Sequence, residues 1–246
     1  MAAKLDAGAA AAGPSGQIPG LAADGLEVDE SAWPGKDLPR RDGFHVIHDS
    51  FRRDFVVLIT AIRTLLERSA RGETAAAAVN CSRIRQWWGT DLLPSLESHH
   101  DNEEKVLLPM LASRAGKAGL VIPDRVAADH RWLMERCGRI SAQLRDAADS
   151  EAGRSTEALG RLLAVAEELS VRLSAHLDEE EATLPRLMRR LFTRGDYATM
   201  GRRIAMSEAR HGLKSVARMT YDASAEDRAL LYHEVGCLAG CVRSCV

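Results

Sequence analysis

Apolar residues recur at intervals of three and four along most of the chain after Phe44, and this spacing is typical of amphipathic α-helices. Strand alternation and the usual hairpin turns are absent from this part of the sequence. We therefore expect an all-α protein. The first apolar stripe illustrates the pattern and consists of Phe44, Ile47, Phe51, Phe55, Leu58, Ile62 and Leu65.

Four long helical segments are expected, over about 43–69, 75–114, 124–148 and 155–193. The second should break near Gly89 or Pro94, because proline lacks the backbone N–H that a helix interior needs. Long amphipathic helices joined by short loops predict an antiparallel up-down four-helix bundle. Two or three shorter C-terminal helices are expected after it, over roughly 197–220 and 225–243.

Composition divides the chain into three predicted parts. Residues 1–42 are rich in Ala, Gly and Pro and are expected to form a flexible tail, 43–195 the bundle, and 196–246 a helical extension. The formal charge is -2, from 33 basic and 35 acidic residues, so no nucleic-acid partner is expected. No apolar run is long enough to span a membrane. With no expected signal peptide, a cytoplasmic protein is predicted.

Six polar residues fall on the apolar stripes, where polar side chains are unfavourable. Each predicted bundle helix carries one histidine on its stripe, and the second and fourth helices each add a glutamate four residues later. These candidate metal ligands are His48, His99, Glu103, His130, His176 and Glu180.

The spacing of these residues explains how they can meet. Side chains four residues apart project from the same face of a helix, so two His-x-x-x-Glu pairs and two single histidines can converge on one cavity. Two buried carboxylates without partners would cost several kcal/mol and repel each other. A pair of cations removes this penalty. Imidazole and carboxylate donors suit iron; manganese or zinc is less expected, and soft metals would favour thiolates.

Two segments carry a specific resemblance. His99–Glu104 with Leu107 and Pro109, and His176–Glu181 with Leu184 and Pro185, resemble the two halves of the hemerythrin-like (HHE cation-binding) bundle family. The resemblance covers about 44–193. It implies a non-haem di-iron centre bridged by Glu103 and Glu180, with His48, His99, His130 and His176 as terminal ligands.

The sequence differs from proteins of the family it resembles at three places. Oxygen-carrying hemerythrins have a second histidine one turn after the position of His130, but Met134 stands there, which implies the loss of a three-histidine iron. His100 follows His99 directly and is either a seventh ligand or a residue behind the ligands. Bacterial iron-centre repair proteins share the six-residue set but carry an N-terminal domain with adjacent cysteines, which residues 1–42 lack.

The residues flanking the candidate ligands have less specific interpretations. Asp49, Asp101 and Asp129 could each accept the second hydrogen bond of a ligand imidazole or lie at the surface. A solvated face is expected to contain Glu104, Glu179 and Glu181, and His45 is expected in solvent at the bundle edge. The four-residue spacing of Cys237, Cys241 and Cys245 favours a packing face over a metal site.

Open positions on two adjacent irons predict reactions with small molecules. The leading interpretation is a di-iron redox protein that binds or turns over dioxygen, peroxide or nitric oxide. The alternatives are a di-iron oxygenase with an organic substrate, and a non-enzymatic oxygen or iron sensor or carrier. The sequence leaves the native ligand, the choice between enzyme and sensor, and the oligomeric state open.

Overall fold

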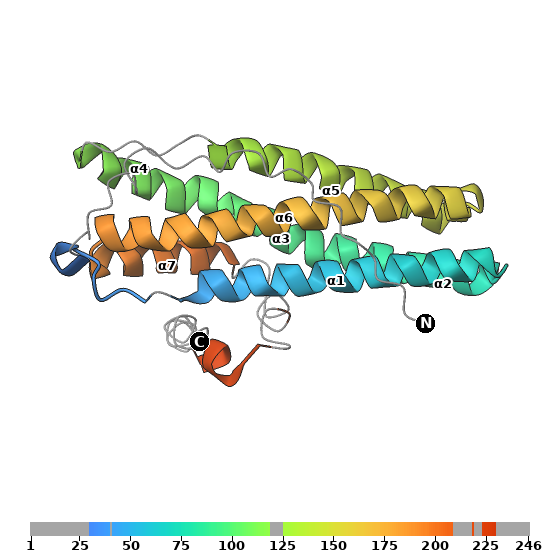
Figure 1. Ribbon diagram of the computed structural model, residues 1–246, viewed down its shortest axis with the longest axis horizontal. Helices are drawn as coiled ribbons and strands as arrows, with labels where there is room; N and C mark the ends of the chain where they lie inside the picture. Colours follow the sequence, from blue (N-terminus) through green and yellow to red (C-terminus); the bar gives the residue numbers. More distant parts are fainter. Residues whose placement is uncertain (1–29, 40, 119–124, 209–217, 219–222, 230–246) are drawn as a thin grey trace, which may run out of the picture.

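The computed structural model describes residues 30–39, 41–118, 125–208, 218 and 223–229 (Figure 1). Throughout these residues the regular elements are helices, which confirms the predicted all-α class. Four rods form the bundle: α1 (Gly43–Ala70), a second rod made of several helical segments, α5 (Arg125–Asp149) and α6 (Thr156–Leu191). The second rod comprises α2 (Thr74–Trp87), η2 (Trp88–Leu92), α3 (Leu93–Asn102), η3 (Glu103–Leu107) and α4 (Leu108–Lys117).

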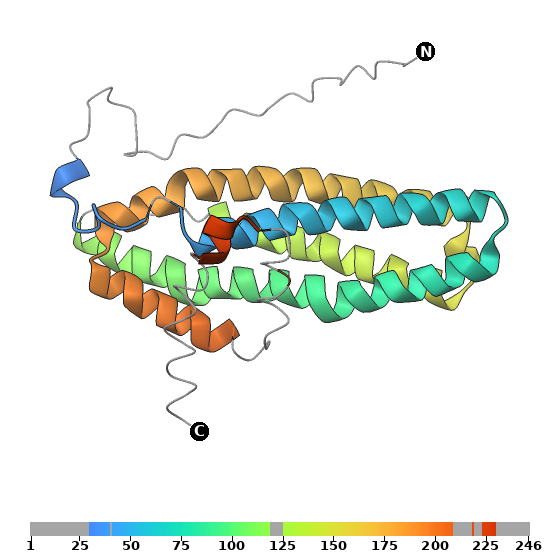
Figure 2. The ribbon, with the colours of Figure 1, turned by 90° about the horizontal axis from the view of Figure 1, so that it is seen from below.

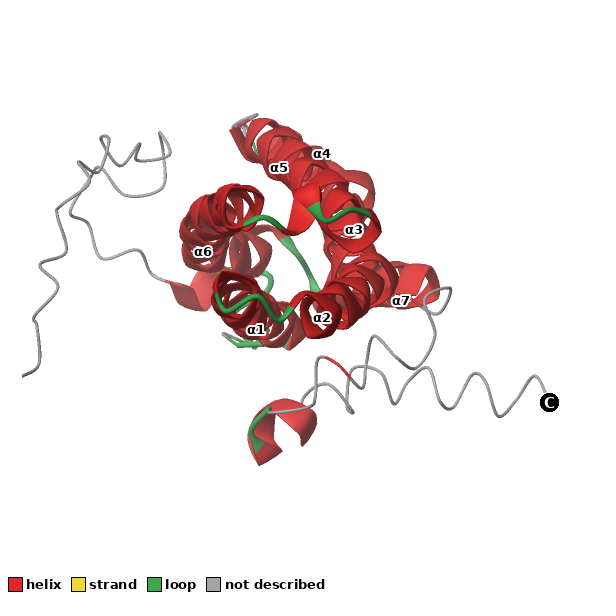
Figure 3. Ribbon diagram, turned by 90° about the vertical axis from the view of Figure 1, so that its right-hand side faces the viewer, coloured by secondary structure: helices red, strands yellow, loops and turns green. Residues whose placement is uncertain are grey.

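The rods are antiparallel and surround a common axis (Figure 3). α1 packs against α2 and α6, and α5 packs against the same two helices from the opposite side. The α1–α2 and α5–α6 connections lie at the same end of the bundle, where the Ser69 hydroxyl donates a hydrogen bond to the Arg154 carbonyl over 2.7 Å. This up-down arrangement turns one apolar stripe of every rod toward the same interior.

Side-chain caps define where the first and last rods begin. The Asp42 carboxylate accepts a hydrogen bond from the Phe44 amide at the start of α1, and the His45 imidazole returns toward the Asp42 amide in a capping box. His45 is therefore a capping residue, and the expectation that it lies in solvent is wrong. Ser155 caps α6 by accepting from the Ala158 amide.

The second rod contains two π-helical turns instead of the predicted break. These are η2 and η3, and each is followed by a proline, Pro94 or Pro109. Within them the Leu93 amide donates to the Trp88 carbonyl, and the Leu108 amide donates to the Glu103 carbonyl. The wider turn lets the rod continue past residues that cannot donate an N–H. Such bulges are frequent at functional sites, and η3 begins at Glu103.

The bundle interior has two apolar cores with a polar layer between them. One core contains Leu96 and Leu173, and the other contains Leu107 and Leu184. Along the second rod and along α6, the His-x-x-x-Glu segments lie between these two cores. Burial of Phe, Leu and Ile side chains on both sides of the layer supplies the hydrophobic stabilisation that holds the polar residues inside.

The last residues of the predicted tail pack against the bundle. The Arg189 guanidinium carbon lies 5.8 Å from the centre of the Trp33 ring. Leu38 is buried among residues of α4 and α6. The Gly35 amide donates a hydrogen bond to the Arg189 carbonyl over 3.0 Å. An added Cβ at Gly35 would lie 2.6 Å from the Phe192 carbonyl oxygen, so this close approach requires glycine.

Gly35→Ala should therefore lower the free energy of unfolding by about 1–3 kcal/mol, because a methyl group is forced against backbone atoms. Gly138→Ala is the matched control: its added Cβ meets nothing within 4 Å in α5. This control should raise stability by about 0.5–1 kcal/mol, since alanine favours helix. Denaturant unfolding of both variants measures the difference, and an unchanged Gly35→Ala protein would show that this contact is dispensable.

The helical extension is described only in part. α7 (Arg194–Glu208) turns back along the second rod, where it contacts α3 and η3 (Figure 2). Helices are expected over 197–220 and 225–243, but after Glu208 the structure describes only residues 218 and 223–229. Cys237, Cys241 and Cys245 lie outside the described residues. Among the helices that the structure describes, none combines the length and apolarity needed to cross a membrane.

Candidate metal centre

The polar layer brings all six candidate residues together inside the bundle. α1 supplies one histidine, the second rod a histidine and a glutamate, α5 one histidine, and α6 a histidine and a glutamate. Every one of them is buried, with at most 6% of its surface exposed. Together with His100, their donor atoms form two groups between the four rods. The first group is His48, His99, Glu103 and Glu180, and the second is His100, His130 and His176.

The first group lies on the α1 side of the layer. The Nε2 atoms of His48 and His99 face each other at 3.1 Å. His99 Nε2 is 3.3 Å from Oε1 of Glu103, and His48 Nε2 is 3.7 Å from Oε2 of Glu180. The donor atoms of all four residues lie within 4.8 Å of one another, which places them around one small volume.

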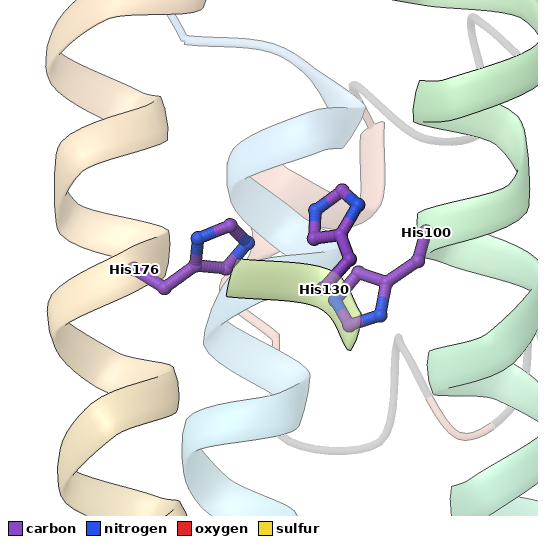
Figure 4. Close-up of side chains that lie close together, drawn as sticks. All are labelled: His100, His130 and His176. Atoms are coloured by element: carbon purple, nitrogen blue, oxygen red, sulfur yellow. The ribbon is translucent and has the colours of Figure 1, made fainter. Parts of the chain in front are cut away.

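The second group consists of three imidazoles on the α5 side of the layer (Figure 4). His100 from α3 lies against His130, and His176 from α6 approaches the same point, so the three rings converge. Their donor atoms also lie within 4.8 Å of one another. The sequence leaves the position of His100 open, and the structure places it in the layer.

Each glutamate faces both groups at once. Glu103 has Oε1 near His99 and Oε2 near His130, each at 3.3 Å. Glu180 has Oε2 near His48 at 3.7 Å and Oε1 near His176 at 3.1 Å. A carboxylate with one oxygen on each side is the arrangement expected of a bridge between two cations.

Most of the buried donor atoms in this layer lack a hydrogen-bond partner. Both carboxylate oxygens of Glu103 and Glu180 are unpaired, as are Nε2 of His130 and Nε2 of His176 and both ring nitrogens of His100. Buried polar atoms are almost always paired, and each unpaired one costs about 1–3 kcal/mol. Cations coordinated by these atoms would remove the cost, so the donor set fits a metal pair.

The electrostatics of the metal-free layer are those of crowded carboxylates. Burial, reinforced by the nearby Glu180 charge, raises the pKa of Glu103 to about 8. Burial opposes the charge of Glu180 too, but contacts with His130 and His176 outweigh it and lower its pKa to about 2. Burial likewise opposes the charge of His130, yet contacts with both carboxylates raise its pKa to about 10. At pH 7 a proton is therefore held on Glu103 and a second proton on His130, while Glu180 is ionised.

Burial has the opposite consequence for three other histidines. It lowers the pKa of His48, His99 and His100 below the usual range for an imidazole. These rings are therefore neutral at pH 7, and a neutral imidazole keeps one nitrogen lone pair available for a metal.

Two further carboxylates orient candidate ligand imidazoles from outside the layer. Nδ1 of His48 donates to Oε1 of Glu181 over 2.9 Å, and Arg52 holds the same oxygen at 2.8 Å. Nδ1 of His130 donates to Oε1 of Glu104 over 2.9 Å. Both bonds leave Nε2 facing the interior, as in carboxylate–histidine–metal triads. The expectation of a solvated face fits Glu104, which is exposed, but it omits the hydrogen bonds that Glu104 and Glu181 make to these buried imidazoles.

The aspartates considered for this orienting role have other partners. Asp49 pairs with Arg41 at 2.8 Å, and Asp101 pairs with Lys105 at 2.6 Å. The shorter side chains of these aspartates pair with exposed cations, whereas Glu104 and Glu181 have longer side chains that reach across to a histidine of a neighbouring rod. These contacts between helices do not follow from the spacing of residues along one helix.

Aromatic rings cover the first group on its apolar side. The Phe44 ring centre lies 4.1 Å from that of His48 and 5.8 Å from that of His99. The Phe51 ring centre lies 5.3 Å from that of His99. Apolar rings beside the layer exclude water and strengthen every charge interaction within it.

Comparison with known families agrees with this geometry. Residues 44–187 match the family model of the hemerythrin HHE cation-binding domain, which is more than half of the 246-residue chain. The chain belongs to the hemerythrin HHE cation-binding family. The resemblance seen in the His-x-x-x-Glu segments is thereby confirmed, and the family indicates a metal-binding helical domain. No curated protein and no solved structure gave a match.

Proposed function

We propose that this hemerythrin-family chain holds two iron ions and uses them to bind or react with dioxygen, peroxide or nitric oxide. One observation carries the proposal: Glu103 and Glu180 each direct one carboxylate oxygen toward each of two histidine groups. That division of oxygens suits two cations better than one, because a single ion would draw both oxygens of a carboxylate to the same side.

The donor chemistry supports iron over the alternatives. The two groups together offer only imidazoles and carboxylates, which suit iron and manganese, whereas thiolates would favour softer metals. Zinc prefers four ligands in a closed tetrahedral site, and two imidazoles with two shared carboxylates would already fill such a site and leave no position for a small molecule. Family membership adds weight to iron, since the domain typically binds it. Iron is therefore the proposed metal, with manganese or zinc as less favoured occupants.

The residues have distinct roles in this proposal. Glu103 and Glu180 bridge the two ions, and His48, His99, His130 and His176 are terminal ligands. Glu181 and Glu104 hold two of those imidazoles in the orientation that keeps Nε2 toward the ions. When bound, a ferrous pair supplies electrons to a small oxidant at an open coordination position. Phe44 and Phe51 keep that position dry.

The same proposal assigns the parts of the chain. Residues 43–195 form the di-iron bundle, 1–42 a tail whose last residues anchor to it, and 196–246 an extension beside it. A cytoplasmic protein without a nucleic-acid partner remains the prediction. A non-enzymatic sensor or carrier is the alternative, because the anchored tail and the extension could report the state of the centre to a partner.

Rapid-mixing absorption measurements on the reduced, iron-loaded protein test the proposed reactivity. Dioxygen, hydrogen peroxide and nitric oxide should each change the iron absorption at a stoichiometry of about one small molecule per iron pair. Continuing loss of excess peroxide would identify an enzyme, whereas a single stoichiometric event would identify a sensor or carrier. An iron-loaded protein whose spectrum is indifferent to all three molecules would contradict the proposal.

Glu104→Ala tests the orienting carboxylates. Loss of the hydrogen bond to His130 should weaken iron binding about 10- to 100-fold, the usual effect of removing a residue behind a metal ligand. Asp101→Ala removes the same charge three residues earlier from an exposed pair with Lys105 and is the matched control. Competition with a calibrated chelator measures both affinities. Equal affinities in the two variants would show that Glu104 does not support His130.

A further inference from the structure

His100 occupies a position that the sequence pattern of two His-x-x-x-Glu pairs and two single histidines does not require. It follows His99 directly in α3, and consecutive helical residues project about 100° apart. That divergence separates their targets: His99 faces His48 of α1, whereas His100 faces His130 of α5. Two adjacent residues of one helix thus reach opposite sides of the polar layer.

The imidazole of His100 is buried without any polar partner. Its residue is only 3% exposed, and both Nδ1 and Nε2 lack a hydrogen-bond partner. A neutral imidazole has one donor and one acceptor, so two unsatisfied atoms are buried at this single side chain. Stacking on His130, with ring centres 4.2 Å apart and planes 17° apart, does not satisfy either nitrogen. Such a side chain is stable in this position only with a ligand for its nitrogen.

The neighbours of His100 identify that ligand as a metal ion. Its donor atom lies within 4.8 Å of donors from His130 and His176, and those two histidines also face Glu103 and Glu180. Donors around one ion lie no more than about 4.2 Å apart, twice a metal–nitrogen bond of about 2.1 Å, so donors that already lie within 4.8 Å of one another need little or no contraction to complete the site. Met134 leaves α5 without a second histidine, and α3 brings an imidazole to the same group.

We propose that His100 is a seventh protein ligand, which makes the two metal positions unequal. This inference rests on the proposed two-metal centre. His100, His130 and His176 hold one ion, His48 and His99 hold the other, and Glu103 and Glu180 are shared. The first ion then has five protein donors and the second has four. In six-coordinate ions, one position stays open on the three-histidine ion and two on the ion beside Phe44.

The donor count also predicts where a small ligand binds. A small ligand that needs two coordination positions on one ion should bind at the two-histidine ion, because only that ion has two open positions. Met134 was expected to imply the loss of a three-histidine iron. In this proposal the three-histidine iron is retained, because α3 supplies the third imidazole through His100. A two-plus-two centre without His100 would instead give both ions the same donor count.

Mössbauer spectroscopy and metal analysis of protein loaded with iron-57 test this inference. Wild type should hold two irons per chain with two distinct quadrupole doublets of equal area. His100→Leu, which fills the same space without a donor, should bind one of the irons at least tenfold more weakly and lose the doublet of the three-histidine iron. His45→Ala removes a histidine outside both groups and should retain both doublets.

Circular dichroism of the metal-free variants verifies the fold, and His100→Gln, which is polar and of similar length, replaces the leucine variant if that one is unfolded. Two tightly bound irons and an unchanged Mössbauer spectrum in the His100 variant would overturn the role of His100 alone. A wild-type chain that fails to bind two irons would instead overturn the two-metal centre on which the inference rests. The two failures are thus distinguishable.

Discussion

Glu180→Ala is expected to reduce bound iron from two ions per chain to less than one. Glu180 is the residue whose two oxygens approach both the His48 side and the His176 side, so its loss removes a donor from each metal position. Cations would then be held by imidazoles and one remaining carboxylate, and two positive ions with less negative charge between them repel more strongly. Elemental analysis after removal of loose iron by gel filtration measures the effect.

Glu179→Ala provides the matched control for this substitution. It removes the same charge from the same helix one residue earlier and should leave two irons per chain, because Glu179 belongs to neither donor group. Circular dichroism should show helical content similar to wild type in both variants. Full retention of two irons by Glu180→Ala would remove this residue from the centre and with it the proposed bridge.

Removal of the metal should lower the melting temperature of the wild-type chain by roughly 15 °C or more at neutral pH. A ligand present at about 1,000 times its Kd adds about 4 kcal/mol of stability, and two such cations add about twice that. Each kcal/mol corresponds to about 2–4 °C for a chain of this size. The physical origin is the set of buried, unpaired carboxylate and imidazole atoms that the metal-free bundle must hold together.

The stability of the metal-free protein should also fall as pH rises from about 7 to 9. Below this range the lowered pKa values of His48, His99 and His100 act in the opposite direction, because those imidazoles gain protons in the unfolded chain and stay neutral when buried. Glu103 has a pKa raised to about 8, so the stability it confers is complete below pH 4.5 and is lost as pH approaches 8. His130 has a pKa raised to about 10, so its contribution is complete below pH 6.5 and is lost as pH rises toward 10. Both contributions therefore decline together in this window.

Calorimetry of chelated and iron-loaded protein at several pH values measures both effects. The gap between their melting temperatures should widen with pH, because coordination removes the penalty for ionised Glu103. Glu103→Gln should flatten the pH dependence of the metal-free form, since glutamine does not titrate. A metal-free protein as stable as the loaded one, or one that becomes more stable from pH 7 to 9, would contradict this account.

The helices and the buried polar residues were predictable because each depends on local spacing. Apolar residues three and four apart define the stripes, and a histidine on a stripe must enter the core with its helix. The helix expected over about 124–148 is α5, Arg125–Asp149, within one residue at each end. Proline also signalled the irregularity of the second rod, but its form was not predictable, since a π-turn and a break follow from the same residue.

The remaining features depend on contacts between helices, which spacing along one helix does not reveal. His100 belongs to the polar layer because α3 faces α5 as well as α1, so two adjacent residues both point inward. Glu104 and Glu181 approach His130 and His48 from neighbouring rods. Only the relative rotation of packed helices determines these pairings. A useful signal was present, however, because a second glutamate, Glu104 or Glu181, directly follows each His-x-x-x-Glu segment.

X-ray absorption spectroscopy at the iron edge, combined with an iron count, tests the central claim most directly. The account predicts two irons per chain, first-shell scattering from nitrogen and oxygen without sulfur, and an iron–iron distance of about 3–4 Å. Glu180→Ala should lose the iron–iron signal. A wild-type chain that binds a single iron, or two irons without a short distance between them, would contradict the proposal that Glu103 and Glu180 bridge two ions.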